Sequence, residues 1–267
     1  MTPYSTLARY YDLENADFTE DLDFWLELAE DHGDPILELG CGTGRVLLHL
    51  ARRGHAITGI DNSPEMLARL ESKGVQLPAP GPQAQVNAPT RARLDVSIVR
   101  ADMKDFSTEK RFRLATMPFN TFMHLLTLED QIAALTCIRK HLQPGAALAL
   151  DMPNPGEAYA APAGEQGLTL ERTFMDGESG SAVQQFSSVA VDRAAQLAHI
   201  TWLYDSVAPD GAVRRAIVPL TLRYTFPGEM RLLLEKCGFT LAHLYGDYQR
   251  APFADGSPRM IVVATAP

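Results

Sequence analysis

Hydrophobic and polar positions alternate between strand and helix spacing over the first half of the chain. Short apolar runs predict buried strands at residues 36–39, 56–60, 94–99, 112–117 and 146–150. Amphipathic periodicity predicts helices at 20–32, at 45–52, from Pro64 onward and at 129–142. Ser63 is placed to cap the helix that begins at Pro64. Strands that alternate with helices predict a mostly parallel sheet with helices on both faces.

The pattern changes after residue 151. Consecutive strands with turn residues between them are predicted at 168–176, 182–191, 196–207 and 212–224. A helix at 226–237 and strands at 239–245 and 259–264 then return to the first pattern. We therefore expect an α/β fold with a Rossmann-like, mostly parallel seven-stranded sheet flanked by helices. An antiparallel β-sheet is inserted after the fifth strand.

These patterns predict a domain organisation. Residues 1–154 and 226–267 are expected to form the main domain, and residues 155–225 an inserted sheet that acts as a substrate cap or an oligomer contact. Residues 77–92 are rich in Pro, Ala, Gln and Gly, which predicts a mobile surface insertion without chemistry.

Composition narrows the class of protein. The formal net charge of -9 disfavours a nucleic-acid partner and suits a small neutral or cationic molecule. The three cysteines are widely spaced, so neither a disulfide framework nor a metal site is expected. No signal peptide or membrane-spanning run is recognisable, which predicts a cytoplasmic protein without a membrane partner. A homodimer is left open.

The run Glu38-Leu39-Gly40-Cys41-Gly42-Thr43-Gly44-Arg45 carries the strongest chemical signal. Glycines directly after a buried strand let the backbone turn sharply and let a ligand lie on it. A dinucleotide-binding loop has the form G-x-G-x-x-G, but Arg45 stands where its last glycine falls. Glu38 suits a cationic part of a ligand and opposes a diphosphate. A nicotinamide-dependent oxidoreductase is therefore disfavoured.

This run resembles motif I of the class I S-adenosylmethionine-dependent methyltransferases. Gly59-Ile60-Asp61-Asn62-Ser63, Ala101-Asp102-Met103 and the stretch from Met117 to Leu125 resemble the next three motifs, in the family's order. Gln143-Pro144-Gly145-Ala146 resembles the turn before the family's fifth strand. Tyr10-Tyr11-Asp12 resembles an element of members that carry an antiparallel insertion and methylate small molecules, including glycine-type and amino-sugar amines.

The resemblance implies S-adenosylmethionine as methyl donor and S-adenosylhomocysteine as product. It implies that Asp61 binds both ribose hydroxyls, that Asp102 binds the adenine amino group and that Met103 packs on the adenine ring. It places Tyr11 over the methionine part of the donor. The other donor contacts that we expect are Glu38, Gly40, Cys41, Gly42, Gly44, Arg45, Asn62, Met66, Pro118 and Phe119. For Arg45, which would bind the donor carboxylate, a surface arginine at a helix start is an equal alternative.

The resemblance places the fourth motif opposite the transferred methyl group, so His124 and Asn120 join Tyr11 as catalytic candidates. His124 is equally compatible with a loop histidine bonded to the backbone, and Asn120 with a turn-stabilising role. Trp202 and Tyr204 share one strand face, which is either the roof of the pocket or a subunit contact. The predicted acceptor contacts are Asn120, Met123, His124, Trp202, Tyr248 and Arg250.

The function predicted from the sequence is methyl transfer to a small molecule, with an amine as the preferred acceptor. Positioning supplies most of the catalysis, because the donor already carries a good leaving group. Two alternatives stay open: O- or C-methylation of a metabolite, and a catalytically silent S-adenosylmethionine-binding protein. No sequence motif identifies the acceptor.

Overall fold

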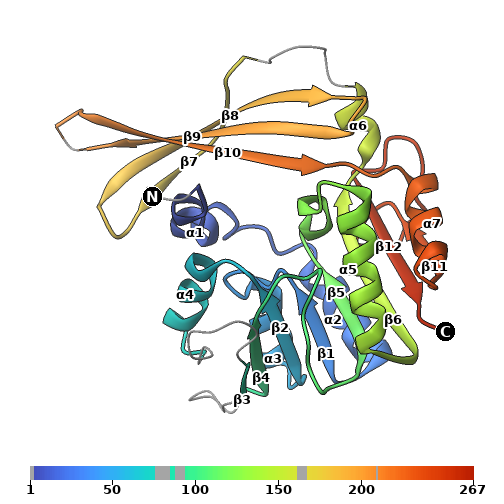
Figure 1. Cartoon of the computed structure of the whole chain (residues 1–267). Helices are drawn as coiled ribbons and strands as arrows, with labels where there is room; N and C mark the ends of the chain where they lie inside the picture. Colours follow the sequence, from blue (N-terminus) through green and yellow to red (C-terminus); the bar gives the residue numbers. More distant parts are fainter. Residues whose placement is uncertain (1–2, 76–84, 88–93, 161–166, 209) are drawn as a thin grey trace.

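A computed structural model of the chain describes residues 3–75, 85–87, 94–160, 167–208 and 210–267. Its first sheet has eight strands in the order β11-β12-β6-β5-β1-β2-β4-β3 (Figure 1). β1, β2, β4, β5 and β6 are parallel, whereas β12 runs antiparallel to both β6 and β11. The strands are β1 (Ile36–Leu39), β2 (Ile57–Asp61), β3 (Gln85–Asn87), β4 (Val96–Arg100), β5 (Phe112–Met117), β6 (Leu142–Pro153), β11 (Thr240–Tyr245) and β12 (Arg259–Thr265).

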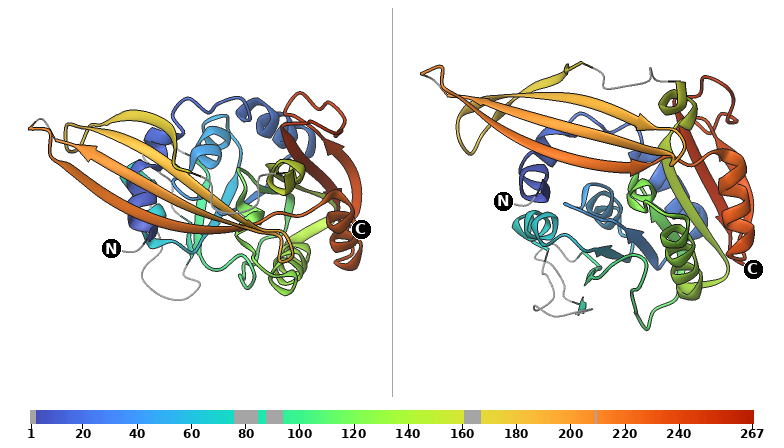
Figure 2. Two further views of the ribbon diagram at one scale, coloured as in Figure 1. Left: turned by 90° about the horizontal axis from the view of Figure 1, so that it is seen from above. Right: turned by 45° about the horizontal axis from the view of Figure 1, so that its top comes forward.

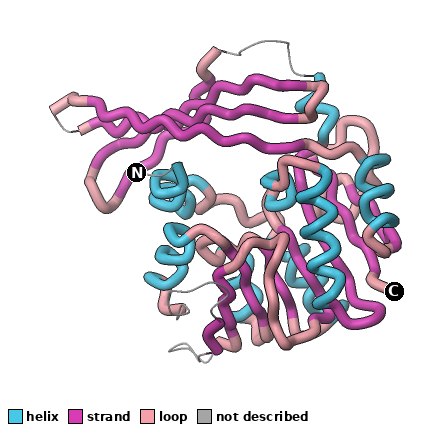
Figure 3. The backbone as a smooth tube through the Cα atoms, in the orientation of Figure 1, coloured by secondary structure: helices cyan, strands magenta, loops and turns pink. Residues whose placement is uncertain are grey.

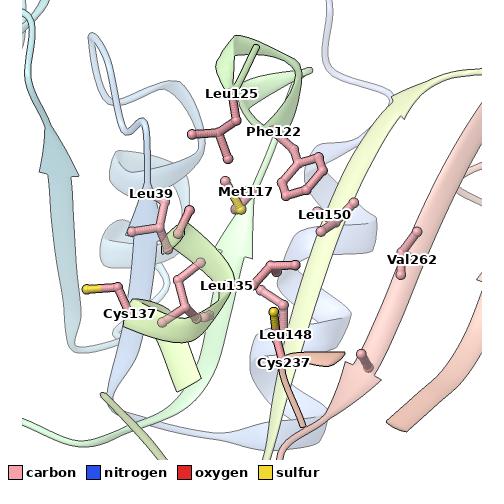
Figure 4. Close-up of a cluster of buried hydrophobic side chains, with 14 of the residues drawn as sticks. Leu39, Met117, Phe122, Leu125, Leu135, Cys137, Leu148, Leu150, Cys237 and Val262 are labelled. Carbon is pink, nitrogen blue, oxygen red and sulfur yellow. The ribbon is translucent and has the colours of Figure 1, made fainter. Parts of the chain in front are cut away.

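Helices cover both faces of this sheet (Figure 1). Alternate residues of β6 show the two layers, because Leu148 and Leu150 pack with α5 and α7 while Ala147 and Ala149 pack with α2 and α3. Figure 4 shows the first of these clusters, in which Leu135 of α5 lies near Leu148. The helices of the two layers are α2 (Leu22–His32), α3 (Arg45–Arg52), α4 (Pro64–Ser72), α5 (Leu128–His141) and α7 (Pro227–Lys236).

The second sheet is antiparallel, in the order β10-β9-β8-β7. It lies across the carboxyl ends of the parallel strands (Figures 1 and 2). Helix α1 (Pro3–Glu14) lies beneath it and contacts both this sheet and α4 (Figure 3). Its strands are β7 (Thr169–Asp176), β8 (Ser181–Asp192), β9 (Leu197–Val207) and β10 (Val213–Arg223).

The predicted fold class is confirmed, including the position of the inserted sheet. Ser63 caps α4 as predicted, since its side chain accepts a hydrogen bond from the amide of Met66. Three short elements were not predicted: α1, the 3-10 helix η1 (Thr121–His124) and α6 (Pro155–Ala160). The division into domains stays a prediction. No helix in the described part of the chain has the length and apolarity to cross a membrane.

The predicted insertion at 77–92 differs from the structure at one point. Residues 85–87 form β3, which pairs antiparallel with β4 and extends the sheet beyond the seven predicted strands. Three residues without an apolar run give no strand pattern, and backbone pairing with the sheet edge accounts for this strand. The rest of the predicted insertion lies outside the described residues.

Candidate active site

The carboxyl ends of four parallel strands bring the predicted donor-binding residues together. The glycine loop follows β1, Asp61 ends β2, Asp102 follows β4, and Pro118 and Phe119 follow β5. β1 lies between β2 and β5, so these motifs line one edge of the sheet. Open α/β sheets bind ligands in this position.

The glycine loop has one crowded and one open position. A Cβ on Gly40 would lie 2.5 Å from Cγ2 of Thr121, so the glycine lets the loops after β1 and β5 touch. A Cβ on Gly42 would meet nothing nearer than the carbonyl oxygen of Gly40 at 3.9 Å. Open space therefore lies directly on the Gly42 backbone, where a ligand can approach closely.

Asp61 is held in place by the loop itself. Its Oδ2 accepts from the Gly42 amide and its Oδ1 from the Ser63 amide, both at 2.8 Å. Burial raises the pKa of this carboxyl group. Each carboxylate oxygen has a second lone pair, so both can still accept from neighbouring hydroxyl groups. This geometry fits the predicted contact with a ribose.

Glu38 is a deeply buried acid at this edge, with only 2% of its surface exposed. Its Oε2 has no hydrogen-bond partner, and burial raises the pKa of its carboxyl group to about 8. A buried, unpartnered acceptor next to the glycine loop suits a donor or cationic group of a ligand.

The remaining donor candidates follow the same edge. Asp102 is partly exposed, and its Oδ1 accepts from the Lys104 amide at 2.9 Å. Met103 packs against the core, Met66 is buried in α4, and Asn62 is exposed. Burial raises the pKa of the Cys41 thiol well above its usual value, so a neutral thiol lies within the loop.

Helix α1 is fastened over the glycine loop. Oδ1 of Asp12 accepts from Oγ1 of Thr43 at 2.6 Å, and Asp12 also pairs with Lys73 at 2.8 Å. The ring of Tyr11 meets that of Phe119 edge to face, with centroids 6.4 Å apart. Burial raises the pKa of Tyr11 to about 12, so its hydroxyl stays protonated at neutral pH. The structure thus brings Tyr11 to the donor edge.

Arg45 is engaged by a residue that the sequence did not indicate. Its guanidinium donates to both oxygens of the fully buried Asp21, at 2.7 and 2.6 Å. It also lies over the rings of Phe18 and Phe119, at 5.0 and 5.2 Å from their centroids. Its role toward the carboxylate of S-adenosylmethionine stays a prediction. Asp21 already accepts hydrogen bonds from two of the Arg45 N–H groups.

The fourth motif contains two successive residues with left-handed backbones, Phe119 at φ 51° and Asn120 at φ 67°. Such conformations cost about 1–3 kcal/mol each outside glycine and need surrounding structure to hold them. The Asn120 amide donates to the Asp151 carbonyl at 3.2 Å. Arg259 donates to Oδ1 of Asn120 at 2.8 Å and to Oδ2 of Asp151 at 3.0 Å.

Tyr248 completes this arrangement, because its hydroxyl donates to Oδ2 of Asp151. Asp151 is fully buried, and Tyr248 is 7% exposed. We call Asn120, Asp151, Tyr248 and Arg259 the Asp151 network. Tyr248 is therefore linked to the fourth motif through Asp151. The neighbouring Arg250 lies against α2, where it pairs with Glu27 at 3.1 Å.

His124 and Met123 end the same motif on η1, which contacts β6 and β10. Met123 is 6% exposed and belongs to the core. The His124 side chain reaches solvent, and desolvation by the surrounding protein lowers the pKa of its imidazole. Trp202 lies on β9 and packs against the cluster that contains Tyr10 of α1 and Tyr204. This face of β9 is therefore turned toward α1. Within the described residues, no group of His, Cys, Asp and Glu is arranged to hold a metal.

Comparisons with known proteins agree with this geometry. Residues 36–145 match the family model described as a methyltransferase domain. The chain is 29% identical over 233 residues to the cypemycin N-terminal methyltransferase of a Streptomyces species, across 86% of this chain and 82% of that protein. It is 26% identical over 155 residues to the dTDP-3-amino-3,6-dideoxy-alpha-D-glucopyranose N,N-dimethyltransferase of Streptomyces fradiae, across 56% and 53% of the two chains.

The fold is shared with solved methyltransferase structures. That of CcbJ from Streptomyces caelestis matches with a TM-score of 0.75 and 24% identity, over 93% of this chain and 96% of that one. The matched domain covers the glycine loop, Asp61 and Asp102, which are the residues that line the carboxyl edge. The chain is therefore an S-adenosylmethionine-dependent methyltransferase of class I, with an antiparallel sheet inserted after the fifth strand of the family's sheet.

Proposed function

We propose that the chain methylates an amine nitrogen of a small molecule, and that His124 accepts the proton which this nitrogen loses. The observation that carries the proposal is the position of His124, which ends η1 in the connection from β5 to α5 and has an exposed side chain. Desolvation by the surrounding protein also lowers the pKa of its imidazole. An imidazole that is neutral at neutral pH can act as a base. The names of the two curated relatives support nitrogen as the acceptor atom.

When bound, S-adenosylmethionine supplies a methyl group on a positively charged sulfur. The lone pair of the amine forms the new C–N bond as the S–C bond breaks, and the amine proton passes to His124. Asp61 would hold the ribose, Asp102 and Met103 the adenine, and Glu38 the amino-acid end. Asn120 and Tyr11 would orient the acceptor and the methyl group, and orientation of this kind supplies much of the rate.

The test is methylation by the purified full-length protein of amines, phenols and carboxylic acids, detected by mass spectrometry. Each amine is paired with its N-acetyl form. We expect methylation of free amines but not of their acetylated counterparts. Methylation of phenols or carboxylic acids alone would overturn the proposal.

The role of His124 has a separate test. We expect His124→Asn to lower kcat by about 10²–10⁴-fold, the usual contribution of a general base. His199→Asn, on the exposed outer face of the inserted sheet, is the matched control and should leave kcat unchanged. An unchanged kcat in His124→Asn would remove this role while leaving amine methylation in place.

Finer expectations accompany this proposal. They are a cytoplasmic location, the absence of a nucleic-acid partner, a homodimer, and a role for residues 155–225 as a substrate cap or an oligomer contact. Light scattering of the purified protein measures the oligomeric state.

A further inference from the structure

A polar cluster lies beneath the inserted sheet, at the end of α1. Gln185 of β8 and Tyr204 of β9 pair directly across the strands, so both side chains point to the same face. This face is turned toward α1, because the ring of Tyr10 lies 5.1 Å from that of Tyr204. Glu14, the last residue of α1, hydrogen-bonds to both side chains. Gln185 and Tyr204 are 2% and 1% exposed.

Two hydrogen-bond acceptors in this cluster have no donor. Nε2 of Gln185 donates to the Tyr204 hydroxyl at 3.2 Å, but Oε1 of Gln185 is buried and unpartnered. Oε1 of Glu14 is likewise buried and unpartnered. A buried acceptor left without a donor is costly, so such groups are normally satisfied. Burial raises the pKa of Glu14, and the guanidinium of Arg172 lies near it and donates to its backbone carbonyl oxygen. Two unpartnered oxygens in one cluster, one on a carboxyl group and one on an amide, call for a ligand group with two N–H or O–H donors.

The cluster lies next to the donor edge. Glu14 follows Tyr11 by three residues, so the two side chains are neighbours on the surface of α1. The helical rise places their Cα atoms roughly 4.5 Å apart along the axis. Tyr11 in turn contacts Phe119 of the fourth motif. A molecule bound to Glu14 and Gln185 would therefore lie beside the residues that face the methyl group.

We propose that Glu14 and Gln185 form the subsite that binds the amino group of the acceptor, and that this group is a primary amine. The proposal rests on the proposed amine methylation. A neutral primary amine has two N–H groups and one lone pair. The two N–H groups match Oε1 of Glu14 and Oε1 of Gln185, and the lone pair attacks the methyl group. The positive charge passes from the sulfur to the methylated nitrogen, which then loses one proton to His124.

The test compares two substitutions of the same type on adjacent residues. Gln185→Leu removes the buried acceptor, whereas Gln184→Leu changes the opposite face of β8 and is the control. Glu14→Gln removes the charge and keeps the shape. The probes are dTDP-3-amino-3,6-dideoxyglucose and a short peptide with a free α-amino group, each beside its N-acetyl form. KM for the probe and the Kd for S-adenosylhomocysteine are measured on the full-length protein.

We expect Gln185→Leu and Glu14→Gln to raise KM for the amine by about 10- to 100-fold, the loss of one hydrogen bond to a charged group. Gln184→Leu should change KM less than twofold. The Kd for S-adenosylhomocysteine should stay constant, which shows that the fold and the donor site are intact. The wild-type protein should also prefer the primary amine to its N-methylated form.

The outcomes separate the two proposals. If the wild-type protein methylates either amine and the three variants share its KM, the subsite is wrong and amine methylation stands. If Gln185→Leu changes the Kd for S-adenosylhomocysteine as much as KM for the amine, the cluster is structural and the subsite is again wrong. If no amine is methylated, the proposed function fails and the subsite fails with it.

Discussion

The Asp151 network makes Arg259 a sensitive point for the stability of the fourth motif. Asp151 is fully buried, and Arg259 is one of the two side chains that donate to it. Replacing Arg259 by Met keeps the length of the side chain but leaves a buried carboxylate with Tyr248 alone. Breaking a buried ion pair in this way costs about 3–5 kcal/mol. The Arg259 side chain is 16% exposed, so we expect the lower end, about 3 kcal/mol.

The same substitution releases Asn120. Its side chain would lose the 2.8 Å bond from Arg259, and the left-handed backbone at Phe119 and Asn120 would lose one of its restraints. We therefore expect kcat to fall together with stability. Urea unfolding followed by circular dichroism measures the loss in the free energy of unfolding. Steady-state kinetics measures the loss in kcat.

A second substitution tests the reason for the loss. Asp151→Asn in the Arg259→Met background removes the unpaired charge, so it should recover about 1–2 kcal/mol of stability, a typical coupling energy for contacting residues. A loss below 1 kcal/mol in Arg259→Met, or no recovery in the double variant, would refute the reasoning about a buried charge.

Three further predictions concern the donor edge. Asp61→Ala should weaken binding of S-adenosylhomocysteine at least 10-fold by calorimetry, and an unchanged Kd would rule out the ribose contact. Burial raises the pKa of Glu38 to about 8 in the folded protein, whereas in the unfolded chain Glu38 ionises near 4.5. The free energy of unfolding should therefore fall as pH rises from about 4.5 toward 8. Glu38→Gln should remove this fall; urea midpoints at pH 5, 6.5 and 8 that decline equally in both proteins would contradict the assignment. Gly40→Ala places a Cβ 2.5 Å from Thr121, so it should lower the melting temperature, and Thr121→Gly in the same chain should relieve the clash but not the backbone strain at φ 64°.

Local patterns account for the parts of the fold that the sequence predicted. The period of apolar residues located the main strands and helices, and Ser63 with Pro64 marked a helix start that the structure confirms. The turn residues between 176 and 211 separated the inserted strands to within a few residues. Each of these signals lies within one element or its ends.

The parts that could not be predicted depend on contacts between distant residues. α1 is stabilised where Tyr10 meets Tyr204, far away in the chain. Likewise, Asp21 is 24 residues from Arg45 and Asp151 is 108 residues from Arg259. A single sequence does not show which charges meet, so the site candidates included Arg45 but not Asp21, the carboxylate that binds its guanidinium. Glu14 gave no signal either, because its surroundings form only when the inserted sheet closes over α1.

The position of α1 has a consequence for the order of events in a catalytic cycle. One side of the helix is tied to the glycine loop through Asp12, and the other side packs on the inserted sheet through Tyr10. The expected donor edge therefore lies against one side of the helix, and the proposed acceptor subsite lies at the end of the helix, between that edge and the inserted sheet. From this stacking we expect a compulsory order, in which the donor enters before the acceptor and its spent form leaves last. In steady-state inhibition, S-adenosylhomocysteine should then compete with S-adenosylmethionine but not with the acceptor.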